Sequence, residues 1–215
     1  MPISAIGTRL DGESVRIAVS LRLGAPVCLR HTCRCSSEVE SNGLHGLDCK
    51  KSAGRHARHS ELINIIYRSL ATVGRPSILE PSGMTQSDGR RPDGLTLFPW
   101  ENGKPLVWDA TCVSTLAASN VTQSMRDPGV AATSAEERKR TKYADLSDEY
   151  VFIPLGFETL GHWGEGAIEF VNKLGRELSQ ATNEPRSTSF LKQRLSIAIQ
   201  RGNAAAVRGT VPVGG

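Results

Sequence analysis

The sequence predicts an α/β fold in which a mixed sheet is flanked by helices. A strand that begins at Asp93 and an apolar run at Leu106-Val107-Trp108 lie on either side of Asn102-Gly103, which is a hairpin signal. Helical periodicity precedes and follows this hairpin. The element order is helix, strand, strand, strand, helix, strand, helix, which is typical of an α/β sandwich with an antiparallel hairpin at its centre.

Two helices are expected before the hairpin. Residues 13–23 place Val15, Ala18 and Val19 on one apolar face, and Gly24-Ala25-Pro26 stops the helix. Residues 58–73 carry a second apolar stripe, and Gly74-Arg75-Pro76 ends that helix. The stripe consists of Leu62, Ile65, Ile66, Ser69 and Leu70. A short strand is expected at 77–81.

The second half of the chain continues the α/β pattern. Residues 114–131 are small and polar and are expected to form a loop or a frayed helix. Thr133 or Ser134 is expected to cap the next helix, with Glu136 in its first turn. A strand at 150–157, a helix at 166–181 and a last helix at 190–200 that ends near Gly202 follow, and residues 209–215 are expected to be disordered.

These elements divide the chain into four expected segments. The divisions are an N-terminal helical segment (1–27), a zinc knuckle (28–55), a core (56–205) and a disordered tail (206–215). The length of 215 residues suits one domain, or one domain with a small appendage. No run approaches 18 apolar residues, and the N-terminus lacks the order of a signal peptide, so we expect an intracellular protein with no membrane partner.

Two carboxylates are expected to meet at one end of the hairpin. Asp93 opens the first strand and Asp109 follows the apolar run of the second, so folding about the turn brings them together. Close carboxylates repel each other unless a cation lies between them, and hard oxygen ligands suit Mg²⁺ or Mn²⁺. Such a site cleaves phosphodiesters by activating water. Because Pro92-Asp93-Gly94 is also an ordinary turn tripeptide, a plain loop is the alternative.

Cysteine and histidine are concentrated in residues 28–59, which hold four of the five cysteines and four of the five histidines. In an intracellular protein this clustering favours metal binding over disulfides. Three thiolates and one imidazole form a closed tetrahedral set for structural zinc. The set consists of Cys33, Cys35, His45 and Cys49. Cys28 or His31 could replace a member of the first pair, and unconnected thiols are the plain alternative.

The order of these motifs resembles the restriction-endonuclease-like, or PD-(D/E)xK, nucleases. That superfamily normally has a lysine two residues after the second acid, where this chain has Thr111. Within it, the chain looks like the endonuclease domain of site-specific non-LTR retrotransposons. In that domain a Cys-Cys-His-Cys element precedes Arg/Lys-Pro-Asp, the second motif often reads Asp-Val-Thr, and a lysine comes from the next helix as Lys-x-x-Lys-Tyr.

The matching residues cover roughly positions 28–175 of this chain. They are Arg58-His59, Arg91-Pro92-Asp93, Asp109-Ala110-Thr111 and Lys139-Arg140-Thr141-Lys142-Tyr143. One departure is the spacing of His45 and Cys49, which three residues separate where the family generally has four. The resemblance implies that Asp93 and Asp109 bind magnesium and that Lys139 or Lys142 is the catalytic lysine. An ammonium group can stabilise the cleaved phosphate wherever its backbone lies.

Two further acids, Glu61 and Glu158, are weaker candidates for the same site. We favour their interpretation as surface charges.

Basic residues favour a nucleic-acid partner. Residues 22–75 contain nine Lys and Arg against four acidic residues, although the net charge of the whole chain is only +4. The expected DNA contacts are Lys50, Lys51, Arg55, Arg58, His59, Arg91 and Tyr143. Phosphate contacts of this kind hold the register of the duplex without reading its sequence.

The resemblance therefore implies a hydrolase, a magnesium-dependent endodeoxyribonuclease that nicks target DNA and creates the 3′ hydroxyl that primes reverse transcription. Because no polymerase domain fits in 215 residues, a reverse transcriptase domain or its RNA is an expected partner, and the nucleus an expected location. Two alternatives are a catalytically inactive, zinc-stabilised module that binds DNA or RNA, and a zinc-stabilised protein-interaction domain.

Overall fold

A four-stranded sheet forms the centre of the protein, for which the computed structural model describes residues 7–84, 89 and 91–211. The strands are β3 (Ser77–Leu79), β4 (Gly94–Glu101), β5 (Lys104–Val113) and β6 (Val151–Glu158), in that spatial order. β3 and β5 both run antiparallel to β4, whereas β5 and β6 are parallel, so the predicted mixed sheet is confirmed. Arg90 and residues 212–215 of the predicted tail lie outside the described residues.

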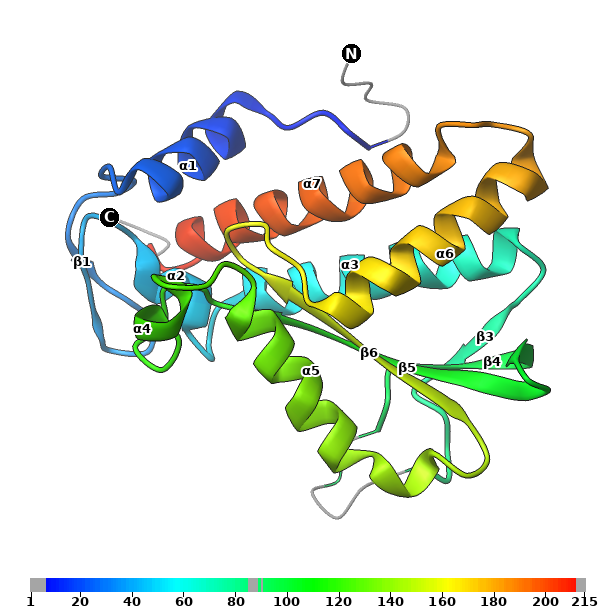
Figure 1. Ribbon diagram of the computed structural model, residues 1–215. Helices are drawn as coiled ribbons and strands as arrows, with labels where there is room; N and C mark the ends of the chain where they lie inside the picture. Colours follow the sequence, from blue (N-terminus) through cyan, green and yellow to red (C-terminus); the bar gives the residue numbers. More distant parts are fainter. Residues whose placement is uncertain (1–6, 85–88, 90, 212–215) are drawn as a thin grey trace.

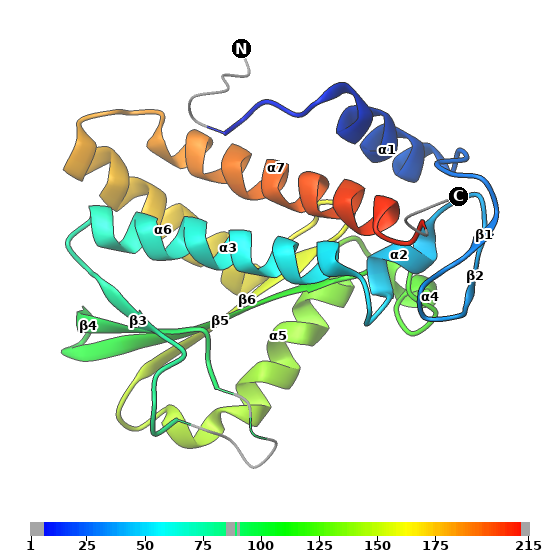
Figure 2. The same cartoon turned by 180° about the vertical axis from the view of Figure 1, so that it is seen from behind.

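Helices cover both faces of this sheet (Figures 1 and 2). α3 (Ala53–Thr72) and α6 (Glu165–Thr182) lie on one face, and α5 (Val130–Lys142) lies on the other. α7 (Ser187–Arg208) packs on α3 and α6 as a second layer, and α1 (Gly12–Leu23) packs on the outer side of α7.

The smaller elements lie around this frame. β1 (His31–Thr32), β2 (Glu38–Val39) and α2 (Leu44–Asp48) form a compact unit against the C-terminal half of α7. α4 (Val121–Ser124) precedes α5, and a short 3₁₀ helix, Ala144–Leu146, follows it.

The main core lies between the sheet and the layer of α3, α6 and α7. The predicted stripe of α3 is confirmed, since all five of its members are buried. Leu62 and Ile66 belong to the same buried cluster as Trp108 of β5, Phe170 of α6 and Leu195 of α7. Burial of a large apolar side chain contributes about 1.5–3 kcal/mol. This cluster therefore fixes α3 and β5, the two elements that carry much of the candidate site, relative to each other.

α1 buries only one member of the predicted face, Ala18, and otherwise a different set of side chains. Ile17 and Leu21 are buried against α7, whereas Val15 and Val19 are 45% and 49% exposed. Both pairs have the four-residue spacing of a helix face, so periodicity alone could not choose between them. The pair with the larger side chains meets α7.

α7 also differs from the prediction, because it continues to Arg208 and includes residues 206–208 of the expected tail. Gly202, where we expected the helix to end, lies against Arg58, and a Cβ atom there would collide with the Arg58 side chain. The glycine thus permits close packing of α3 on α7 and does not end the helix.

Two fully buried glutamates bind the N-termini of two helices. Glu158, at the end of β6, accepts the N–H groups of Ala131 and Ala132 at 3.1 and 3.2 Å. α5 therefore begins at Val130, and the predicted cap at Thr133 or Ser134 is wrong, because a residue distant in sequence provides the acceptor.

Glu136 does the same for α6. Its carboxylate accepts the N–H groups of Gly156 at 2.9 Å, Gly166 at 2.9 Å and Ala167 at 3.0 Å. One side chain of α5 thereby links that helix to both β6 and the start of α6. The sequence predicted Glu136 in the first turn of the helix, whereas α5 begins at Val130, which places Glu136 in the second turn, and the side chain is 0% exposed.

Replacing Glu136 with alanine is expected to lower the free energy of unfolding by about 3 kcal/mol or more, because three buried N–H groups lose their acceptor. Urea denaturation measures the change. Glu137→Ala is the matched control, since Glu137 is the exposed neighbour on the same helix, and we expect a change within about 0.5 kcal/mol. Equal stability of the two variants would contradict this role of Glu136.

Candidate active site and metal cluster

Four ligand side chains converge beside the β1–β2 hairpin. Their donor atoms all lie within 4.8 Å of one another. The group consists of Cys33, Cys35, His45 and Cys49, as the sequence predicted. Cys33 and Cys35 lie in the turn between β1 and β2, His45 lies on α2, and Cys49 follows α2 directly.

The geometry of this cluster suits a tetrahedral ion. The Sγ atoms of Cys33 and Cys49 are 3.8 Å apart, and Sγ of Cys35 is 3.1 Å from Nε2 of His45. Thiolates at a zinc–sulfur distance of about 2.3 Å stand roughly 3.8 Å apart in a tetrahedron. Hydrogen bonds from Ser37 lower the pKa of Cys35 to about 6, which favours the thiolate that binds metal. The four residues could therefore hold a structural metal such as zinc.

The two alternative ligands have other partners. Sγ of Cys28 lies within hydrogen-bond reach of the carbonyl oxygens of Glu40 and Ser41. The ring of His31 donates through Nδ1 to the Leu29 carbonyl and lies 3.0 Å from the Thr210 hydroxyl through Nε2. Neither residue belongs to the converging group.

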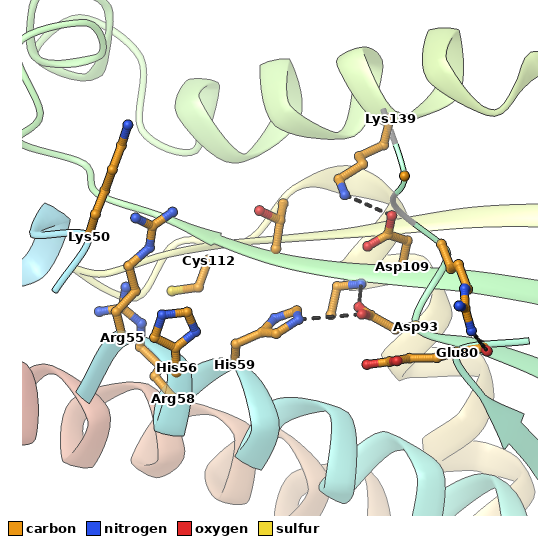
Figure 3. A pocket seen from close by; sticks show the side chains of 14 residues that line it. Lys50, Arg55, His56, Arg58, His59, Glu80, Asp93, Asp109, Cys112 and Lys139 are labelled. Carbon is orange, nitrogen blue, oxygen red and sulfur yellow. Dashed lines mark hydrogen bonds and ion pairs between the residues drawn. The ribbon is translucent and has the colours of Figure 1, made fainter. Parts of the chain in front are cut away.

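A second site lies where β5 extends past β4. Gly94, the first residue of β4, pairs with Trp108, so residues 109–113 of β5 pair with β6 on one side only. A cavity of about 760 Å³ lies along this open edge (Figure 3). Its described wall comes from the segment after the cysteine cluster, from α3, from the segment between β3 and β4, from the open edge of β5 and from α5.

The two predicted acids lie together in this cavity. Oδ2 of Asp93 accepts the N–H of Ala110 at 2.6 Å, an N–H on the open edge of β5. The side chains of Asp93 and Asp109 are both largely buried, with residue exposures of 9% and 3%. Gly94 permits this arrangement, because the Trp108 ring occupies the place of a Cβ atom at that position. The Pro-Asp-Gly segment is thus a strand entry packed against a tryptophan.

Lys139 reaches the same site from α5. Its Nζ atom is 2.7 Å from Oδ2 of Asp109 (Figure 3). Burial and the neighbouring Asp93 carboxylate raise the pKa of Asp109 to about 6, and Lys139 opposes this shift. Two carboxylates crowded in this way form a site that a cation would stabilise. The side chain of Lys142 instead lies with its Nζ 5.0 Å from the centre of the Tyr143 ring, and it is not part of the described cavity wall.

The expected DNA contacts divide into two groups. Five of them line the cavity: Lys50, Arg55, Arg58, His59 and Arg91. Lys51 is exposed outside the cavity wall. Tyr143 is only 1% exposed and packs against Phe152, so a DNA contact by its side chain would require the core to open.

Two residues of the cavity have contacts that the sequence did not indicate. Arg58 is 2% exposed, and its guanidinium donates to the side-chain oxygen of Asn203 at 2.7 Å and to the Leu47 carbonyl. It therefore joins α3 to α7 and α2. His59 points at Asp93, with Nε2 3.4 Å from Oδ1, and this carboxylate raises the pKa of His59.

The remaining candidates lie elsewhere or have structural roles. Glu61 is exposed, as favoured from the sequence, whereas Glu158 is the buried helix cap described above and not a surface charge. Thr111, two residues after Asp109, lines the cavity.

No protein-family model matches the chain, and no curated protein matches it either. Within the described part of the chain, no helix combines the length and the apolar character needed to cross a membrane.

Substitution of Cys49 by serine is expected to abolish the binding of one zinc ion per chain and to destabilise the β1–β2 unit, because one of four ligands is lost. Zinc released on denaturation, measured by elemental mass spectrometry, gives the stoichiometry. Cys28→Ser is the control and should retain the full zinc content. Equal zinc content in both variants would exclude the cluster as the binding site.

Proposed function

We propose that this chain is a metal-dependent DNA endonuclease with a restriction-endonuclease-like core. The observation that carries the proposal is the juxtaposition in one cavity of Asp93, which precedes β4, Asp109 of β5 and Lys139 of α5. Two close carboxylates can hold a divalent ion and an ammonium group can stabilise developing charge, which together can hydrolyse a phosphodiester. The mixed sheet flanked by helices and the order of the motifs support the same proposal.

Asp93 and Asp109 would hold a Mg²⁺ or Mn²⁺ ion. Two carboxylates buried close together suit such an ion, and burial, followed by the charge of Asp93, raises the pKa of Asp109. When bound, the ion would act as a Lewis acid on the phosphate oxygens.

Lys139 is the proposed catalytic lysine in place of a residue at position 111. Its Nζ atom contacts Asp109 directly, so it lies at the edge of the place where the scissile phosphate would bind. The ammonium group would orient the attacking water and stabilise the charge that develops on the phosphate. Lys142, three residues later, is assigned no such role, because it is not part of the described cavity wall.

DNA is the proposed substrate because the cavity is rich in basic groups on the side of the cysteine cluster. Lys50 and Arg55 extend along this side in Figure 3, away from the two acids. Such residues neutralise backbone phosphates independently of sequence. By the resemblance, the product would be a nick whose 3′ hydroxyl primes reverse transcription. A reverse transcriptase domain or its RNA is then the proposed partner, and the nucleus the proposed location.

The test is nicking of supercoiled plasmid in the presence of Mg²⁺ or Mn²⁺. The parent chain is expected to convert the plasmid to open circle, and Asp93→Asn, Asp109→Asn and Lys139→Ala are each expected to lose at least about a hundredfold in rate. Lys142→Ala is the matched control, and we expect its rate to stay within about threefold of the parent.

A gel-shift assay on the same plasmid separates the second candidate function. DNA binding without nicking by the parent chain would favour a catalytically inactive binding module, for which the basic wall would be sufficient. Full nicking by Asp93→Asn would refute the proposed active site.

A further inference from the structure

Two described histidines, His56 and His59, line the cavity. Of these, His59 forms an ion pair with a candidate metal ligand. It projects from the first half of α3 toward Asp93, and its Nε2 atom is 3.4 Å from Oδ1 (Figure 3). The other oxygen of Asp93, Oδ2, is held by the N–H of Ala110. Oδ1 is therefore the Asp93 oxygen that faces the imidazole and remains available to an incoming cation.

We propose that His59 is a direct nitrogen ligand of the divalent ion held by Asp93 and Asp109, and that this ligand makes the site prefer transition-metal ions to Mg²⁺. The inference rests on the proposed metal site and adds a third ligand and a selectivity to it. Adjacent ligands of a six-coordinate ion with bonds of about 2.1 Å stand roughly 3 Å apart. The observed 3.4 Å between Nε2 and Oδ1 is close to that spacing.

The three donors come from different parts of the fold. Asp93 precedes β4, Asp109 lies on the open edge of β5, and His59 lies on α3. They converge less tightly than the four ligands of the cysteine cluster. Among the described residues, that cluster is the only group of three or more His, Cys, Asp or Glu side chains whose donor atoms lie mutually close. The side chain of His59 is 42% exposed, so it is not locked by packing and could turn toward a bound ion.

The chemistry of the donor set decides the selectivity. Mg²⁺ is bound almost entirely through oxygen, and it gives up water reluctantly. Imidazole is a ligand of transition metals, and the affinity of mixed nitrogen and oxygen sites rises from Mn²⁺ through Fe²⁺ to Co²⁺. A site of two carboxylates alone would discriminate weakly, whereas two carboxylates with His59 would discriminate strongly.

The test is metal binding by the full chain after its cysteine cluster has been loaded with zinc. Pulsed electron paramagnetic resonance of bound Mn²⁺ is expected to show the coupling of one directly bonded ¹⁴N nucleus. This signal should be absent in His59→Ala and present in His56→Ala, the matched control. His56 lines the same cavity from the same helix, but the ion pair with Asp93 belongs to His59.

Calorimetric titration with Mn²⁺, Co²⁺ and Mg²⁺ gives the second readout. In His59→Ala the Mn²⁺ and Co²⁺ affinities are expected to fall at least tenfold, and the Mg²⁺ affinity less than threefold. Equal losses for all three ions, or a nitrogen signal that persists in His59→Ala, would overturn the proposal.

The outcome is separable from that of the nuclease proposal. A nitrogen signal that depends on both His59 and Asp93, in a chain that does not nick DNA, would support the metal site and refute the nuclease. Nicking that depends on Asp93, with no nitrogen signal in the parent chain, would support the nuclease and refute His59 as a ligand.

Discussion

The register of the β4–β5 hairpin is the constraint on which the candidate site depends. Gly94 pairs with Trp108, which leaves Asp109 as the first residue of β5 beyond the start of β4. A shift by one residue would exchange the two faces of β5, so Asp109 would turn into the core and Trp108 toward α5. The Trp108 ring, which occupies the place of a Cβ atom on Gly94, therefore helps to fix the register by shape.

Two buried glutamates outside the cavity, Glu136 and Glu158, determine the position of α5 and so of Lys139. Glu158 binds the first turn of α5, and Glu136, one turn before Lys139, binds β6 and the start of α6. Each carboxylate meets the partial positive charge of a helix N-terminus, which offsets part of the cost of its burial. α5 is thus held at two points against β6, the strand that pairs with β5. The 2.7 Å contact between Lys139 and Asp109 is a consequence of this arrangement.

The sequence predicted the local features of the fold and not those that depend on tertiary partners. The turn at Asn102-Gly103 and the stripe of α3 were readable because their signals lie within a few residues. The ligand set Cys33, Cys35, His45 and Cys49 was readable from spacing and chemistry, although only the folded hairpin excluded Cys28 and His31. The start of α5 was not readable, since its acceptor is Glu158.

Lys139 could not be distinguished from Lys142 in the sequence, because residues three apart share a helix face and the choice depends on which one meets β5. His59 was expected to contact DNA, and its nearness to Asp93 became visible only with α3 docked on the sheet. The available sequence signal was the Arg58-His59 pair near the start of an amphipathic helix, which the resemblance included.

The cysteine cluster and the α/β core form one connected unit, although the sequence suggested two adjoining segments. A Cβ atom on Gly54, in the first turn of α3, would collide with the backbone of Ala206 in α7, so the start of α3 lies directly on that helix. The buried Arg58 bonds to both α7 and α2. Cys49 is followed at once by Lys50, a residue of the cavity wall. The cluster thereby determines where the basic wall stands relative to the acids, and a metal bound there would shape the cavity in which a second metal would act.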